Sequence, residues 1–205
     1  MKKKIILFTL SCCFLIAIGV LIFGGNSKKD INPNEAIDYL KNLNSYSCEV
    51  TVHIKNSKQE IEKECKQFYN KNYGHRLDIG DKRVLIYKNN DILVRDLNND
   101  MQYSVDKDFD DVYKLSFLEE YIGLLYTNHN VETSFKNIND REYELIDLTV
   151  PGNNRNLNRA VLYVNLEYNY PEKIILYDIK GKERVSFTYK NFVSNPEISE
   201  EVFKK

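Results

Sequence analysis

The sequence predicts an α+β fold: a large curved antiparallel β-sheet, a half-barrel of about eleven strands, with helices on its concave face and a membrane segment at the N-terminus. Three observations lead to this prediction. Short stretches of alternating apolar and polar residues fill most of the chain, one helix with a broad apolar face interrupts them, and an uncharged run lies near the start. A sheet of that size tends to curl, and the helix must bury its apolar face against it.

The uncharged run at the N-terminus predicts a membrane segment. Residues 5–25 carry no charge over 21 positions, and Lys2, Lys3 and Lys4 precede them. About 20 apolar residues can span the hydrocarbon core, whereas the apolar part of a cleavable signal has only ~7–15. The basic end is expected to stay in the cytoplasm, so the remainder faces outward. We expect a signal or anchor at 1–25, a linker at 26–32 and one domain at 33–205.

Two adjacent cysteines inside this run raise the question of lipidation. A lipoprotein signal ends with small residues before the modified cysteine. Before Cys12, Ser11 fits that pattern but Leu10 does not. Before Cys13, Leu10 and Ser11 fit but Cys12 does not. The residues after them stay apolar, where a lipoprotein would turn polar. A lipid anchor at Cys12 or Cys13 and an uncleaved spanning helix both remain open, and the residues favour the helix.

A short helix followed by a hairpin is expected at the start of the domain. Asn32 can cap the helix, Pro33 suits its first position and Glu35 completes a capping box. The hydrophobic period then changes from 3.6 to 2 over residues 45–55, which predicts a strand, and a second strand follows at 59–70.

The remaining strands are predicted by the same alternation, bounded by Asn, Asp, Gly and Lys clusters. They occupy residues 75–79, 83–88, 91–97, 101–105, 131–138, 142–150, 159–168, 172–179 and 184–193, and residues 198–203 suggest a final helical turn.

One long helix is predicted between the two groups of strands, over residues 108–128. Asp108 can cap it, and Asp110 and Asp111 suit the positive end of its dipole. Its expected apolar face consists of Phe109, Val112, Tyr113, Phe117, Tyr121, Leu124 and Leu125.

Two further cysteines lie in the first two predicted strands. If residues 56–57 form a two-residue turn, Lys55 faces Lys58 and Cys48 faces Cys65. Opposite Cβ atoms lie about 4.5–5.5 Å apart, slightly more than the ~3.8 Å that a disulfide prefers. An extracytoplasmic location permits a bridge, and two reduced cysteines packed in the core are the alternative.

Composition argues against several functions. Without residues 1–25 the chain has 26 basic and 30 acidic residues, a net charge of −4, and no basic stripe, so nucleic acid is not expected as a partner. No histidine has a second ligand at metal-binding spacing, and no catalytic motif or phosphate-binding loop is present, so we expect no cofactor. The aspartates at 106–111 lack the pattern of a calcium loop. The chain is therefore expected to bind rather than to catalyse.

The order of elements resembles the LolA/LolB-like lipoprotein fold over about residues 33 to 203. Three stretches carry the resemblance: QFYNKNYGHRLDI at 67–79, VLIYKNNDILVRDLNNDMQY at 84–103, and YPEKIILYDIKGKERVSFTYKNFVSNPEISEEVF at 170–203. The last has a proline opening a strand, a glycine turn, a strand ending in asparagine and a short helix with phenylalanine.

Within that fold the chain is similar to the GerS-type germination lipoproteins of spore-forming clostridia. The shared features are a basic start, one membrane segment and an exported part rich in Tyr, Lys and Asn. The resemblance implies a non-enzymatic protein of the spore envelope that binds and activates CwlD, a zinc-dependent N-acetylmuramoyl-L-alanine amidase. That amidase acts in the step toward muramic-δ-lactam that cortex lysis requires in germination. The resemblance assigns no partner-contacting residue to this sequence.

Two other functions remain open. A lipid or lipoprotein carrier of the LolA type would use an apolar concave face. An envelope-stress sensor is disfavoured, because only Met1–Lys4 would remain in the cytoplasm. Long antiparallel edges would also allow a homodimer.

Overall fold

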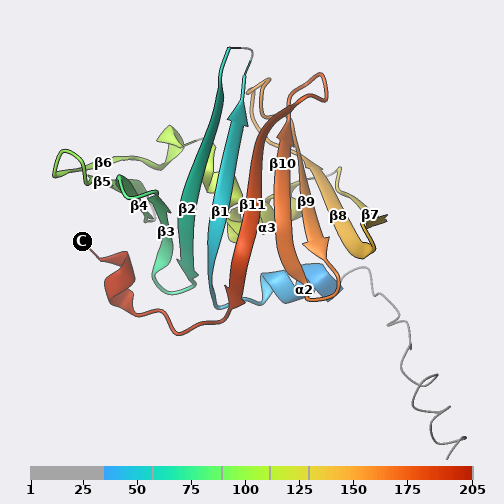
Figure 1. Ribbon diagram of the computed structural model, residues 1–205, viewed down its shortest axis with the longest axis horizontal. Helices are drawn as coiled ribbons and strands as arrows, with labels where there is room; N and C mark the ends of the chain where they lie inside the picture. Colours follow the sequence, from blue (N-terminus) through green and yellow to red (C-terminus); the bar gives the residue numbers. More distant parts are fainter. Residues whose placement is uncertain (1–34, 57, 89, 111, 129, 205) are drawn as a thin grey trace, which may run out of the picture. The chain divides into compact units, whose positions relative to one another are not determined.

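The computed structural model describes residues 35–204 except 57, 89, 111 and 129, and these residues form one open sheet of eleven antiparallel strands (Figure 1). The predicted curved sheet is confirmed, and every predicted strand is found within a few residues of its place. The strands are β1 Ser45–Lys55, β2 Glu60–Asn70, β3 Gly74–Ile79, β4 Arg83–Tyr87, β5 Asp91–Asp96, β6 Met101–Asp106, β7 Glu132–Ile138, β8 Arg141–Thr149, β9 Arg159–Asn165, β10 Tyr170–Tyr177 and β11 Glu183–Ser194.

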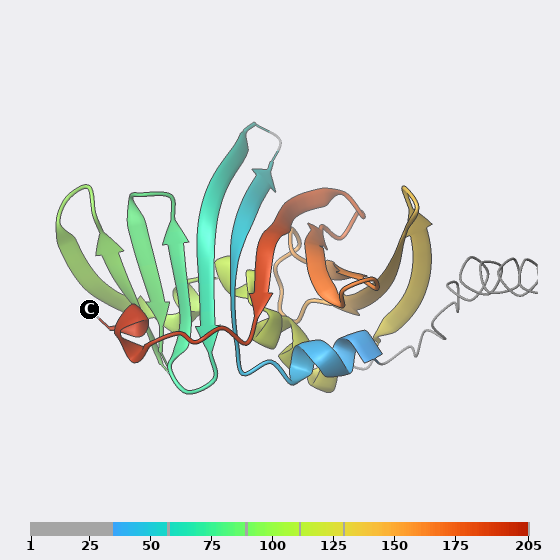
Figure 2. The same ribbon diagram turned by 60° about the horizontal axis from the view of Figure 1, so that its bottom comes forward.

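The sheet consists of two meanders joined at its centre. Its order is β6-β5-β4-β3-β2-β1-β11-β10-β9-β8-β7, so the first and last strands of the chain pair with each other. In that ladder Val50 faces Tyr189 and Val52 faces Phe187. Strands β6 and β7 form the two edges. Figure 2 shows the two meanders on either side of the β1–β11 pair.

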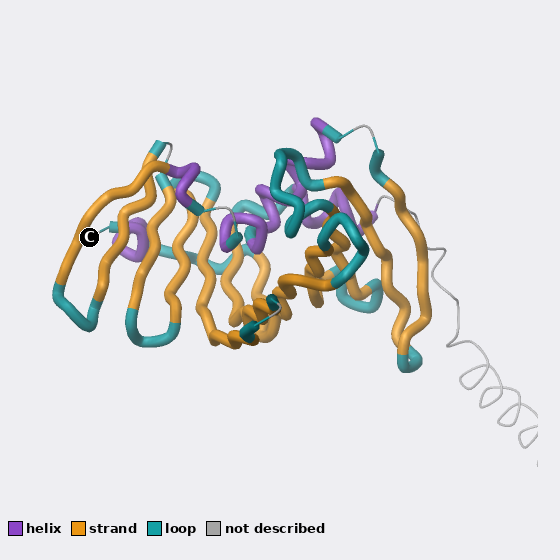
Figure 3. Tube along the Cα trace, turned by 90° about the horizontal axis from the view of Figure 1, so that it is seen from above, coloured by secondary structure: helices purple, strands orange, loops and turns teal. Residues whose placement is uncertain are grey.

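The helices lie along the inner face of the sheet, where the main core forms. Helix α2 spans Glu35–Lys41 and helix α3 spans Leu118–Thr127. Figure 3 shows helical segments, in purple, along one side of the curved strands. The core joins both helices to inward side chains from β1 to β5 and β8 to β11. Because side chains alternate along a strand, smaller apolar clusters form on the outer face at β4–β5 and β8–β9.

The long helix predicted over residues 108–128 is wrong in extent. The segment forms two 3-10 turns, η1 Lys107–Phe109 and η2 Tyr113–Ser116, before α3 begins. Phe117, between η2 and α3, has an extended backbone and is buried. Local hydrogen bonds explain the break. Asp106 caps η1 by accepting from the backbone N–H of Asp108, and Asp110 accepts from three backbone N–H groups at the start of η2.

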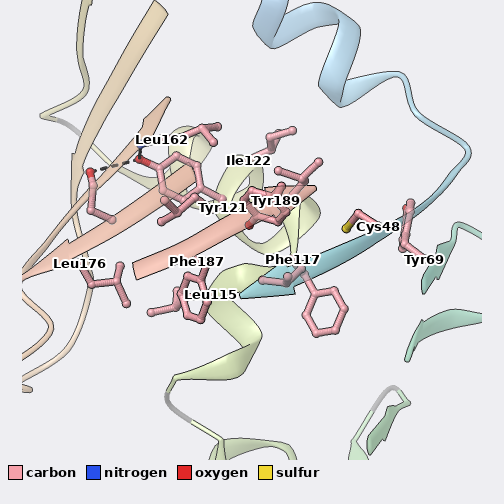
Figure 4. Close-up of a cluster of buried hydrophobic side chains, with 14 of the residues drawn as sticks. Cys48, Tyr69, Leu115, Phe117, Tyr121, Ile122, Leu162, Leu176, Phe187 and Tyr189 are labelled. Atoms are coloured by element: carbon pink, nitrogen blue, oxygen red, sulfur yellow. Dashed lines mark hydrogen bonds between the residues drawn. The ribbon is translucent and has the colours of Figure 1, made fainter. Parts of the chain in front are cut away.

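Buried tyrosines fasten α3 to the sheet (Figure 4). The Tyr121 hydroxyl lies 2.8 Å from the carbonyl of Ile146 and accepts from the N–H of Leu162 at 3.1 Å. The Tyr46 hydroxyl accepts from the N–H of Leu118, which is one of the unpaired donors of the first helical turn. Tyr189 donates to the carbonyl of Ser116. Burial raises the pKa of all three phenols well above its usual value, so they remain neutral donors.

The chain ends in a third 3-10 turn, η3 Glu200–Phe203, as the final segment predicts. Phe203 is buried, and its ring lies 5.9 Å from that of Tyr73. Arg76 donates to the carbonyl of Val202 at 2.7 Å and holds this turn against β3.

Candidate binding groove

An open groove of about 810 Å³ lies on the inner face of β1–β6. Its floor is apolar, and five strands, β1 and β3 to β6, contribute to it. In the register, Leu85 faces Val94 and Ile92 faces Val105, so these side chains form adjoining rows. Side chains that point to the same face of neighbouring strands build such a floor by alternation alone. The apolar floor residues are Ile54, Ile79, Leu85, Ile92, Val94 and Val105.

Two aromatic side chains stand exposed at the rim of this groove. Phe109 in η1 is 80% exposed, and Tyr103 on the edge strand β6 is 42% exposed. Charged residues of both signs also line the groove: Glu62, Lys63, Glu64, Asp81, Lys82 and Arg83. An apolar floor with exposed aromatic residues and a charged rim is the composition of a binding surface.

Asp110 fixes the geometry of the groove wall. Its carboxylate accepts from the backbone N–H groups of Val112, Tyr113 and Lys114 at 2.8–3.0 Å and from the Tyr87 hydroxyl at 2.7 Å. The residue is 8% exposed. These four hydrogen bonds satisfy a carboxylate that burial would otherwise destabilise, and they connect η2 to β4.

The structure corrects the predicted pairing of Cys48 with Cys65. Cys48 faces Gln67 and Cys65 faces Val50, two residues away from the prediction, because the turn occupies residues 56–59 rather than 56–57. Both thiols are free and buried on the same face of the sheet, as diagonal neighbours. Burial raises the pKa of the Cys65 thiol to about 12 and also raises that of Cys48. The proposed lipidation residues Cys12 and Cys13 lie outside the described residues.

The described histidines make local contacts. His53 lies on the outer face, 2.6 Å from Glu60, and this hydrogen bond is the main cause of the lowered pKa of that carboxyl. His75 Nε2 is buried without a well-directed hydrogen bond, 3.4 Å from the carboxylate of Glu119. Across residues 35–204, gaps excepted, no three His, Cys, Asp or Glu side chains are placed to hold a metal ion.

Sequence reasoning missed the exposed aromatic residues of the groove. It assigned Phe109 to a buried helix face, whereas η1 ends at Phe109 and leaves its ring in solvent. A signal was available, because Phe109 lies among Asp106, Asp108 and Asp110. Aspartates at short intervals favour turns rather than the interior of a helix.

Within the described part of the chain, no helix is both long and apolar enough to cross a membrane. The expected anchor at residues 1–25 lies outside that part.

Several solved structures are similar to this chain. An uncharacterized conserved protein from Thermus thermophilus matches with a TM-score of 0.57 and 10% identity, over 84% of this chain and 92% of that one, and it shares the fold. The structure of the CwlD amidase from Clostridioides difficile in complex with the GerS lipoprotein matches with a TM-score of 0.47 and 22% identity, over 82% and 98%. A LolA superfamily protein from Nitrosomonas europaea matches with a TM-score of 0.43 and 12% identity, over 86% and 99%.

No curated protein sequence matches the chain significantly. The model of one protein family does, and it is described as sporulation protein YdcC-like. The match runs from residue 2 to residue 203, which includes the groove and both meanders. The chain therefore belongs to the YdcC-like sporulation protein family.

Proposed function

We propose that this protein is a membrane-anchored, non-enzymatic binding protein on the outer side of a spore membrane, and that it binds and activates a cortex amidase of the CwlD type. Membership of a sporulation family supports the setting. The sequence resemblance to GerS-type lipoproteins suggests the partner, and the amidase would supply its own zinc.

The groove is the observation that carries this proposal. Phe109 presents nearly its whole ring to solvent beside an apolar floor. Binding energy at protein interfaces concentrates on a few aromatic or arginine side chains at the centre of an apolar patch. We infer that Phe109 and Tyr103 are the main contacts with the amidase, and that the charged rim orients it.

The test is a pull-down of the purified cognate amidase by the full chain in detergent. Phe109→Ser should weaken amidase binding at least about tenfold, the effect of losing ~1.4 kcal/mol at an interface. Tyr126→Ser is the matched control, because Tyr126 is 65% exposed on α3 and does not line the groove. Undiminished binding by Phe109→Ser, or no complex with the original protein, would contradict the proposal.

The same groove also favours a second function, binding of an acyl chain. Its volume of about 810 Å³ is within the range of small-molecule sites, roughly 300–1,000 Å³, and its floor carries no charge. Native mass spectrometry of the purified protein separates the two functions. A co-purified lipid that Val105→Trp excludes would support a carrier, whereas an empty protein that retains the amidase supports the activator.

A further inference from the structure

Two adjoining pockets lie away from the groove, at the end of the sheet where β8 begins, β9 ends and β10 begins. Their volumes are about 410 and 250 Å³, and they share Arg141 and Glu172. The strand register brings this end together, because Tyr143 faces Asn165 and Asn165 faces Tyr170. Figure 1 shows β9 and β10 meeting at this end of the sheet.

The shared carboxylate of Glu172 is held in place from one side. The Tyr143 hydroxyl lies 2.8 Å from each of its oxygens, and the amide of Asn165 donates to Oε2 at 3.3 Å. Arg141 lies 4.0 Å away. The Glu172 side chain is nevertheless 39% exposed. A carboxylate that is fixed and still open to solvent has lone pairs available for a ligand's hydroxyl groups.

The larger pocket favours an anionic group. Among its lining residues Arg141 and Lys173 are basic and Glu172 alone is acidic. The Lys173 ammonium lies 4.9 Å from the centre of the Tyr163 ring, which limits its freedom. Two cations and the amide of Asn139 line this pocket, and guanidinium and ammonium groups form strong hydrogen bonds with carboxylate or phosphate.

The smaller pocket offers an aromatic surface. Tyr168 is 57% exposed, and its ring centre lies 6.0 Å from that of Tyr170. Its hydroxyl donates to Glu167 at 2.6 Å, which restrains the ring. An exposed ring gives a flat apolar surface, and amide and carboxylate groups beside it can hydrogen-bond. A sugar ring, which has an apolar face and several hydroxyl groups, can stack on the tyrosine and hydrogen-bond to the polar groups.

We propose that this end of the sheet binds an acidic glycan strand. One sugar ring stacks on Tyr168, its hydroxyl groups bond to Glu172, and a carboxylate enters the larger pocket between Arg141 and Lys173. This ligand and surface differ from those of the proposed amidase complex. If the protein binds both the amidase and the glycan, the two sites are linked by the reaction. The amidase hydrolyses a sugar-linked amide and frees a carboxylate on the sugar, and this site would retain the product strand.

The full chain in detergent is titrated with peptide-free strands of alternating N-acetylglucosamine and N-acetylmuramic acid. Neutral N-acetylglucosamine oligomers and a phosphate-bearing glycerol polymer are the comparison ligands. We expect the carboxylate-bearing strand to bind at least about tenfold more tightly than either. Tyr168→Ala and Arg141→Gln should each weaken it by about tenfold, whereas Phe109→Ser should leave it unchanged.

Absence of binding, equal binding of the neutral oligomer, preference for the phosphate polymer, or unchanged affinity of both site variants would each overturn the assignment. Circular dichroism of each variant checks that it is folded. The amidase pull-down is scored separately on the same proteins. Tyr168→Ala should lose the glycan and keep the amidase, and Phe109→Ser should do the reverse, so either proposal can fail without the other.

Discussion

Glu144 on β8 is fully buried, and neither of its carboxylate oxygens has a hydrogen-bond partner. It lies on the inner face, opposite Val164 on β9. Loss of solvent raises the pKa of this carboxyl to about 7. The folded state therefore holds the proton more tightly than the unfolded chain does. Ionised Glu144 destabilises the fold, and the penalty is absent below about pH 4.5, grows up to pH 7 and is complete above it.

This residue gives the first prediction at the scale of single side chains. A shift of this size corresponds to at most about 3 kcal/mol. The free energy of unfolding of the original protein should fall by up to that amount, relative to Glu144→Gln, between pH 5 and pH 8. Urea unfolding at both pH values measures it, with Glu120→Gln as the exposed control on α3. Parallel pH dependence of the original protein and Glu144→Gln would refute this account.

The buried thiols give the second residue-scale prediction. Because burial suppresses ionisation of Cys48 and Cys65, both should resist alkylation in the native protein at pH 8 and react fully in urea. Peptide mass spectrometry after differential alkylation reads each cysteine separately from Cys12 and Cys13. A disulfide-linked peptide joining Cys48 and Cys65 would contradict this prediction, because it would show that the two diagonal neighbours form a bridge.

At the scale of elements, strands could be predicted from the sequence and the central helix could not. Each strand shows its period of two locally, as in Val50 and Val52, so its place follows from adjacent residues. The break before α3 depends on a distant partner as well as on local hydrogen bonds, because the Tyr46 hydroxyl on β1 accepts from the N–H of Leu118. The hairpin register likewise depended on turn length. Asn56 caps a four-residue turn by accepting from the N–H groups of Lys58 and Gln59.

The candidate groove could likewise be predicted from the sequence only in part. The apolar residues of its floor, such as Leu85 and Val94, were assigned to strands correctly. Among the described residues, none that lines the groove belongs to an α-helix, since the helix expected to run from residue 108 instead begins at Leu118. That outcome follows from the local hydrogen bonds of Asp110 together with the tertiary contacts that Asp110 and Phe117 make with Tyr87.

Asp110 gives the prediction at this scale. Asp110→Ala removes the acceptor for three backbone N–H groups and for Tyr87, and it should lower the free energy of unfolding by about 2–3 kcal/mol. Tyr87→Phe removes only the hydroxyl and should cost about 1 kcal/mol. Urea unfolding of the three proteins compares them. Equal costs would mean that the backbone turn does not depend on this carboxylate.

At the scale of the whole domain, the two meanders share one core. The β1–β11 ladder joins them, and Phe187 on β11 lies fully buried between Val52 on β1 and Ile174 on β10. Helix α3 contributes to the same cluster. Neither meander can lose its inner face alone without exposing apolar side chains of the other, so we expect a single cooperative unfolding transition.

Phe187→Ala tests this cooperativity. Removal of a fully buried ring should cost about 3–5 kcal/mol, whereas Phe135→Ala on the edge strand β7, where the ring is 44% exposed, should cost less than about 1 kcal/mol. Far-ultraviolet circular dichroism follows the sheet, and tyrosine fluorescence follows the packed rings. Both signals should shift together in Phe187→Ala. Separate midpoints would mean that the meanders unfold independently and that the central ladder joins two units rather than forming one core.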